Sequence, residues 1–207
     1  MDATNAKENI LKKINEALVQ QVPLPFPQQT APLFNKPEDE LDILFAQEFT
    51  QLQGKFCYCQ SEAEMQQQIQ SLIAAKDWTK IFCSDSRWSD IFSNTISLAT
   101  CDVSITGCEY LVARTGSIVM SAAEQSGRTV SVYAPVHICI AYTQQLVFEI
   151  KDALLLLKNK YENNIPSFIT FATGPSRTAD IEKTLVTGVH GPKEVYLFLV
   201  EMPVAKN

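Results

Sequence analysis

Apolar residues follow helical spacing in some stretches and short β-like runs in others, and the two alternate from residue 38 onward. A helical pattern of leucine and phenylalanine over residues 41–52 ends at Gly54, and residues 55–60 follow as a short strand. The same order repeats with a helix around residues 65–73 and a strand over residues 80–83. This alternation predicts an α/β fold, in which a mainly parallel sheet is flanked by helices that form the crossovers.

The pattern becomes richer in β-type runs after residue 101. Thr115 and Gly116 lie in a polar turn between two such runs, where a glycine lets a ligand approach the backbone. Further on, Pro135 interrupts a long apolar run and places His137 at the head of a strand, where a histidine could act as acid or base. We therefore treat these residues as candidate ligand contacts. The alternative for His137 is a hydrogen-bonded core residue.

After a long helix over residues 146–161, the chain predicts a strand over residues 167–173, a short helix and a strand over residues 194–201. The short helix ends at Gly188, and its apolar face is formed by Ile181, Leu185, Val186 and Val189. The strand–helix–strand order predicts a parallel pair with a right-handed crossover.

A separate helix is predicted ahead of this domain, from apolar residues at helical spacing between Ile10 and Leu18. Five prolines then lie between residues 23 and 37, and prolines at this density favour a stiff, extended linker. We therefore predict an N-terminal helix and proline-rich arm over residues 1–37 and an α/β domain over residues 38–207. The helix crosses the main body or a neighbouring subunit, or it is a loosely docked arm, so a homo-oligomer is left open.

Composition narrows the classes of function. A net charge of −6 and a pI near 5.0 argue against nucleic-acid binding, which needs a basic footprint. Neither a membrane span nor a signal peptide is predicted, so we expect a cytoplasmic protein. The six cysteines form no C-x-x-C pair and the chain has two histidines, so we expect reduced thiols and no metal site.

The turn from Gly174 to Asp180 carries the polar groups that best suit a ligand. It follows a predicted strand and precedes a predicted helix, where free backbone N–H groups and the helix dipole favour an anion. The Ser176 and Thr178 hydroxyls and the Arg177 guanidinium add donors for a phosphate or carboxylate. Asp180 holds Arg177, binds a sugar hydroxyl or favours the first helical turn. The alternative is a well-capped helix with a surface arginine.

A second turn contains Gly188, His190, Gly191 and Pro192. A helix of about ten residues would place it about 15 Å from Arg177, so we expect these four residues to be structural or to form an interface. The sequence contains no Ser-His-Asp order, H-E-x-x-H motif or paired-carboxylate pattern, so no catalytic residue is assigned.

Four motifs, in this order and spacing, resemble those of the LUD-domain family. The resemblance covers the main domain and is strongest between Ser104 and Glu201. It implies a fold similar to the NagB/RpiA/CoA-transferase group. The motifs are RTGSIV at 114–119, PVHICIA at 135–141, TGPSRTADIE at 173–182 and LVTGVHGP at 185–192.

The resemblance also implies a role in oxidising L-lactate to pyruvate, together with two iron–sulfur partner proteins. Iron–sulfur clusters are then expected only in those partners, with no cofactor in this chain. The family commonly has glutamate where this chain has Arg114. Two alternatives stay open: an independent enzyme acting on a phosphosugar, acyl-CoA or folate-like ligand, and a structural or regulatory assembly module without a ligand.

Overall fold

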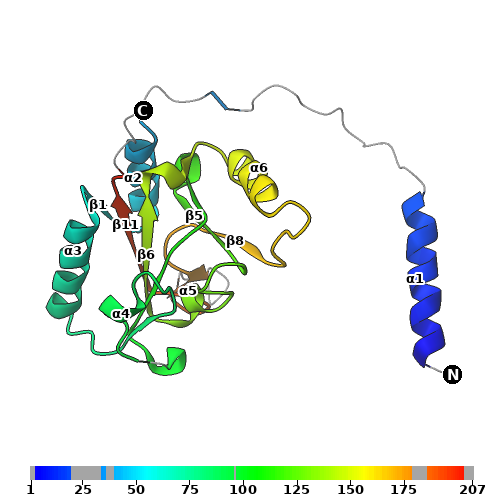
Figure 1. Ribbon diagram of the computed structural model, residues 1–207, viewed down its shortest axis with the longest axis horizontal. Coiled ribbons are helices and arrows are strands. Elements are labelled where there is room, and N and C mark those ends of the chain that lie inside the picture. Colours follow the sequence, from blue (N-terminus) through cyan, green and yellow to red (C-terminus); the bar gives the residue numbers. More distant parts are fainter. Residues whose placement is uncertain (1–2, 20–33, 36–39, 96, 179–185, 203–207) are drawn as a thin grey trace. The chain divides into compact units, whose positions relative to one another are not determined.

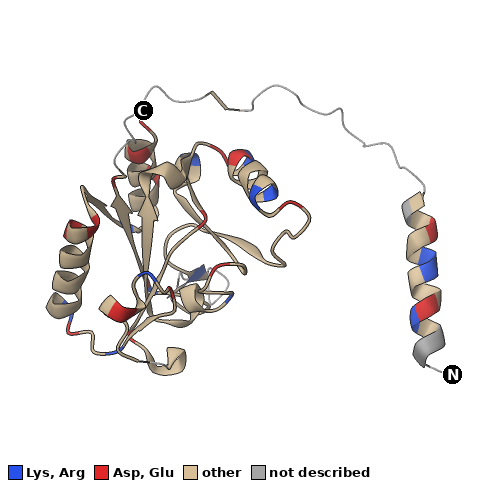
Figure 2. Cartoon of the chain, in the orientation of Figure 1, with Lys and Arg blue, Asp and Glu red and all other residues tan. Residues whose placement is uncertain are grey.

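The computed structural model describes residues 3–19, 34–35, 40–95, 97–178 and 186–202. The chain divides into two compact units, Met1–Lys36 and Pro37–Asn207. In the first unit, helix α1 (Ala3–Val19) leaves its apolar residues Ile10, Leu11 and Ile14 exposed. Acidic and basic residues alternate along its ribbon (Figure 2). No helix among the described residues is long and apolar enough to cross a membrane.

A five-stranded parallel sheet forms the centre of the second unit, in the order β1-β11-β6-β3-β2 (Figure 1). The predicted mainly parallel sheet with flanking helices is therefore confirmed. The C-terminal strand β11 lies inside the sheet, between β1 and β6. The strands are β1 (Lys55–Cys59), β2 (Ile81–Cys83), β3 (Val103–Thr106), β6 (Val136–Tyr142) and β11 (Glu194–Val200).

A smaller sheet packs against one face of the central sheet, in the order β7-β4-β5-β8. Its strands are β4 (Tyr110–Val112), β5 (Ser117–Ser121), β7 (Leu146–Val147) and β8 (Ile169–Ala172). Strand β8 pairs antiparallel with β5 in this sheet, whereas β11 belongs to the central sheet. The predicted parallel pair between residues 167–173 and 194–201 is therefore wrong, because the two strands belong to different sheets.

Three apolar layers hold the second unit together. Helices α3 (Glu62–Ala75) and α4 (Ser89–Phe92) cover one face of the central sheet. The other face packs against helix α2 (Leu41–Gln51) and the smaller sheet. We call this contact the inter-sheet layer. Helix α6 (Ile150–Tyr161) covers the far side of the smaller sheet, and α5 (Val130–Tyr133) precedes β6.

The predicted helix after Ser176 is wrong at both of its ends. Strand β9 (Arg177–Thr178) pairs antiparallel with β10 (Val186–Thr187), and residues 179–185 between them lie outside the described residues. The two structures place the ends of this segment differently. Antiparallel pairing sets the two ends side by side, whereas a helix separates them by its length. This difference decides where the candidate site forms.

Gly116 shows how closely α2 approaches the smaller sheet. Its φ of +57° is left-handed, and a Cβ at this position would lie 2.6 Å from the backbone nitrogen of Phe49. The close approach at this glycine is therefore made by helix α2. Gly127 offers a matched control, since its φ is +59° and nothing lies within 4 Å of its would-be Cβ.

We expect Gly116→Ala to lower the free energy of unfolding by about 3 kcal/mol or more, from left-handed strain together with overpacking. Gly127→Ala should cost only about 1 kcal/mol, because strain acts there without a clash. Urea unfolding of both variants measures the difference. Equal losses would contradict the tight contact between α2 and Gly116.

Candidate functional site

A pocket of about 220 Å³ opens where the first residues of β6 and β11 face β8 and α5. Its walls carry hydroxyl, imidazole and glycine backbone groups around an apolar floor. The polar and glycine residues that matter here are Ser131, His137, Gly174, Ser176, His190 and Gly191.

Backbone hydrogen bonds around Ser176 join the turn that begins at Gly174 to the turn of Gly188, His190, Gly191 and Pro192. The Ser176 amide donates to the carbonyl of Pro192 at 2.9 Å, and the Gly188 amide donates to the carbonyl of Ser176 at 2.8 Å. Gly191 lies so close that a Cβ on it would be 3.0 Å from the Ser176 Cβ. His190 therefore lines the same pocket as Ser176, which corrects the expectation that a helix keeps the two turns apart.

His137 is the most buried polar group of the pocket, with 1% of its surface exposed. Its Nε2 lies 2.8 Å from the Thr106 hydroxyl, which also lies 2.9 Å from the carbonyl of Gly107. The tautomer of the ring sets which of the two groups donates to the other. Burial lowers the pKa of His137 to about 4, so the imidazole is neutral near pH 7.

Thr115 connects to the pocket through other hydroxyls but does not line it. Its Oγ1 lies 2.8 Å from the Ser117 hydroxyl, which in turn lies 2.8 Å from that of Thr173, a lining residue. The neighbouring Arg114 donates from Nε to Glu149, the residue that precedes α6. Arg114 is thus ion-paired beside the smaller sheet.

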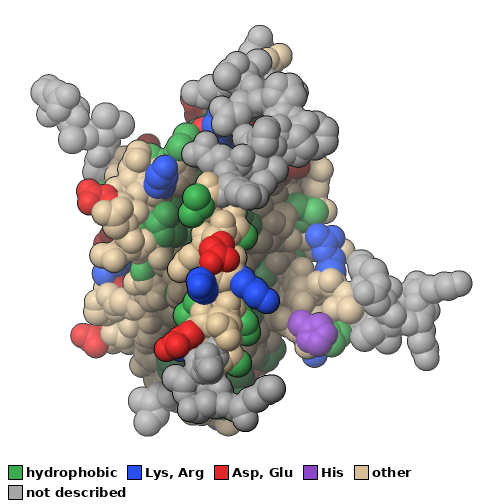
Figure 3. Space-filling model, turned by 90° about the vertical axis from the view of Figure 1, so that its right-hand side faces the viewer, with side chains coloured by type: hydrophobic (Ala, Val, Ile, Leu, Met, Phe, Trp, Pro, Cys, Tyr) green, Lys and Arg blue, Asp and Glu red, His purple; other side chains and the backbone are tan. Residues whose placement is uncertain are grey.

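The remaining predicted residues contribute less to the pocket. Arg177 and Thr178 lie in β9 and are not among its lining residues, and Asp180 lies outside the described residues. The positive charge near the pocket comes instead from Lys193, which lines an adjoining hollow of about 430 Å³. His190 lines both cavities and is the exposed histidine; a histidine is visible on the surface in Figure 3.

Sequence reasoning missed Ser131, Thr106 and Thr173. Ser131 and Thr173 line the pocket, and Thr106 orients the His137 ring from the neighbouring strand. The register of β3 against β6 pairs His137 with Ser104, and Thr106 lies two residues further along β3 on the same face. Across the part of the chain that the structure describes, no three His, Cys, Asp or Glu side chains lie close enough together to hold a metal ion.

The buried neutral state of His137 predicts a pH dependence of folding. Its pKa is about 4 in the folded chain against about 6.5 when unfolded, so protons favour unfolding. The lowered pKa of His137 contributes about 3 kcal/mol to the free energy of unfolding above pH 6.5, and this contribution is lost as the pH falls toward 4. Between pH 7 and pH 4.5, wild type should lose about 2 kcal/mol more than His137→Gln in urea unfolding. The control His190→Gln should follow wild type, and a His137→Gln curve parallel to both would contradict the buried neutral ring.

Comparison with known proteins gives a consistent family. A sequence model of the LUD domain matches residues 44–200. A lactate utilization protein C from Anoxybacillus flavithermus is 28% identical over 196 residues, which cover 84% of this chain and 87% of that protein. The protein of the same name from Bacillus licheniformis is 35% identical over 102 residues.

That second match covers 48% of this chain and 42% of the relative, so the matched part spans less than half of the relative's length. Among solved structures, a DUF162 family protein from Deinococcus radiodurans is similar with a TM-score of 0.59 and 17% sequence identity. The similarity covers 77% of this chain and 96% of that one, and it shows a shared fold.

Proposed function

Because the chain belongs to the LUD-domain family, we propose that it takes part in lactate utilization as a subunit that binds a small carboxylate in the pocket of His137 and Ser176. The convergence of His137, Ser176 and His190 on one small pocket carries the proposal. A volume of about 220 Å³ suits a three-carbon acid, whereas a CoA or folate-like ligand would have to extend into the adjoining hollow.

The chemistry of the lining suits a hydroxy acid. His137 can form a hydrogen bond to the substrate hydroxyl, and the Ser176 hydroxyl and the glycine backbone offer donors to a carboxylate. His190 and Lys193 at the mouth add a charged or polar rim. These groups bind and orient the acid, which is the role we assign to this chain.

Oxidation of L-lactate to pyruvate releases two electrons and two protons, so an acceptor is required. We assign this acceptor to iron–sulfur partner proteins, with this chain supplying the carboxylate-binding subunit and no cofactor of its own. The relatives named lactate utilization protein C support the process, and the partners belong to the proposal.

Ser176→Ala should weaken binding of L-lactate or pyruvate about threefold to tenfold, the loss expected for one hydrogen bond. Ser71→Ala, at an exposed position on α3, is the matched control and should bind as wild type does. Isothermal titration calorimetry measures both. A wild type that binds neither acid, or equal affinities in the two variants, would overturn the assignment of the pocket.

The purified chain alone should show no lactate oxidation, and activity should appear only when the iron–sulfur partners are added. Co-expression with affinity capture tests whether those partners are retained. Robust lactate turnover by the isolated chain would contradict the accessory role and favour an independent enzyme. Stabilisation by phosphosugars or CoA, but not by lactate, would also favour the independent enzyme.

A further inference from the structure

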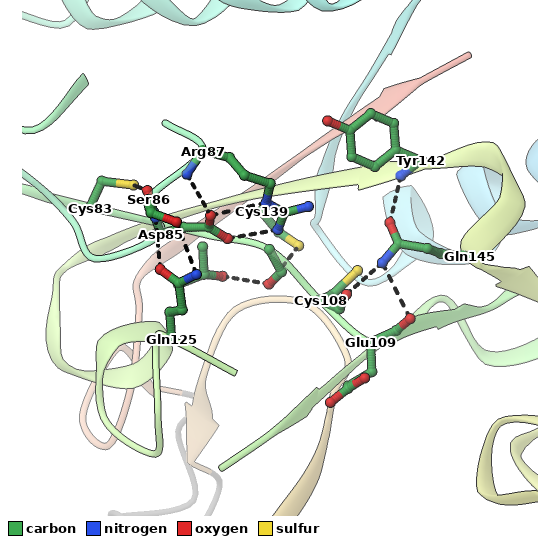
Figure 4. Close-up of polar contacts among 12 residues, drawn as sticks. Cys83, Asp85, Ser86, Arg87, Cys108, Glu109, Gln125, Cys139, Tyr142 and Gln145 are labelled. Carbon is green, nitrogen blue, oxygen red and sulfur yellow. Dashed lines mark hydrogen bonds and ion pairs between the residues drawn. The ribbon is translucent and has the colours of Figure 1, made fainter. Parts of the chain in front are cut away.

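A second polar cluster lies at the opposite edge of the central sheet, where its parallel strands end (Figure 4). Asp85 and Arg87 follow β2, Glu109 follows β3 and Tyr142 ends β6. The carboxyl ends of strands in open α/β sheets are the usual places for ligands. The pocket of His137 lies at the amino ends of β6 and β11, so the two places are distinct.

Arg87 is held in place from three sides. Its Nε and Nη2 donate to the Asp85 carboxylate at 3.0 and 2.7 Å, and its guanidinium lies 4.1 Å from the centre of the Trp88 ring. A Cβ on Gly107 would lie 2.8 Å from Nη2, so the guanidinium packs closely against this glycine. Asp85 is 7% exposed, whereas 53% of the Arg87 side chain faces solvent.

This arrangement leaves one edge of the guanidinium available. A guanidinium has two edges that can grip a pair of oxygens, and Asp85 occupies the edge formed by Nε and Nη2. Nη1 of Arg87 has no hydrogen-bond partner among the residues the structure describes. The Nη1–Nη2 edge therefore presents a preorganised fork that matches a carboxylate or phosphate.

Glu109 and Glu124 form a pair of carboxyl groups that is bridged by Ser121. The Ser121 amide donates to Glu124 at 3.1 Å, and its hydroxyl donates to Glu109 at 2.6 Å. Glu109 is also bound by Lys160 at 2.7 Å and Tyr161 at 2.6 Å. Burial opposes ionisation of Glu109, but these hydrogen bonds hold its pKa below the usual value.

Glu124 differs from Glu109, because no ion pair to it is found within the described ranges. Burial raises the pKa of Glu124 to about 7, with a further contribution from the charge of Glu109. The turn that carries it is tied to the Arg87 loop, since the Ser86 amide donates to Gln125 at 2.7 Å and Gln125 donates back to the Ser86 hydroxyl at 3.1 Å. Two carboxyl groups with opposite pKa shifts are a pattern typical of acid–base sites.

We propose that Arg87 and Glu124 form a second ligand site, which binds the carboxylate or phosphate of a small metabolite. Arg87 binds the anion with its outer edge, and the ionisation of Glu124 sets how this binding depends on pH. The site is independent of the pocket assigned to lactate, and it uses no residue of that pocket.

The site predicts that anion binding strengthens as the pH falls through 7. The charged groups that act on Glu124 are Arg87 from the β2–α4 loop, Glu109 from the residue before β4 and Lys160 from α6. Protonation of Glu124 removes a negative charge next to the bound anion, whereas Glu109 stays ionised. Affinity should therefore be higher at pH 6 than at pH 8, and Glu124→Gln should remove most of that difference.

Calorimetric titration of the full chain with inorganic phosphate and, separately, with malonate tests the site and distinguishes the two anions. We expect one or both to bind, and Arg87→Gln to weaken that binding at least tenfold. Arg128→Gln is the matched control, because Arg128 is an exposed arginine that bonds Ser167 and lies 5.8 Å from the Phe168 ring. It should retain affinity within about twofold.

Arg87→Lys provides a second variant if Arg87→Gln fails to fold. Lysine keeps a positive charge that can pair with Asp85, but it lacks the two-nitrogen edge of the guanidinium. Its affinity should also drop about tenfold, since a single ammonium cannot replace a bidentate contact. The proposal is overturned if wild type binds neither anion, if Arg87→Lys binds as tightly as wild type, or if the Arg128 control weakens as much as Arg87→Gln.

Discussion

The inter-sheet layer is the constraint on which the rest of the second unit depends. Phe45 and Phe49 of α2 and Leu197 of β11 are fully buried in it, and burying each such side chain is worth about 2 kcal/mol. Alternate residues of β6 face this layer, so the strand that puts Cys139 there must also put His137 there. The packing therefore forces a histidine into the interior, where it is neutral and bonded to a neighbouring strand. The pocket forms where the layer ends, at the amino ends of β6 and β11.

The sequence allowed the central sheet to be predicted because each of its elements has a strong local pattern. The helices over 41–52 and 65–73 and the strands around 55–60 and 80–83 all occur within a few residues of their expected places. The motif from Gly174 to Pro192 behaves differently. Its run of apolar residues is short enough to fit either a helix or a pair of strands. The observed pairing of β9 with β10 brings the two ends of the motif together, whereas a helix would separate them. His137, Gly174 and Ser176 were expected as site residues and line the pocket, but Arg177 does not.

The second site could not be predicted from the sequence, because its contacts join residues far apart in the chain. Ser86 and Gln125 are separated by 39 residues, and Glu109 and Lys160 by 51. Residues 84–88 look like an ordinary polar turn until the order of the strands places them beside Gly107. The fold thus offers two chemically different edges of one parallel sheet. One edge carries neutral imidazole and hydroxyl groups, and the other carries an arginine fork and a pair of carboxyl groups bridged by Ser121.

The two turns and the start of β6 build one pocket, and the chain's two histidines allow this to be observed directly. Their ring signals can be followed by ¹H–¹⁵N NMR while L-lactate is added. The signals of His137 and His190 should both shift, with the same apparent Kd, because both residues line one cavity. Signals that shift with different apparent Kd values, or a His137 ring unaffected at saturating lactate, would contradict it.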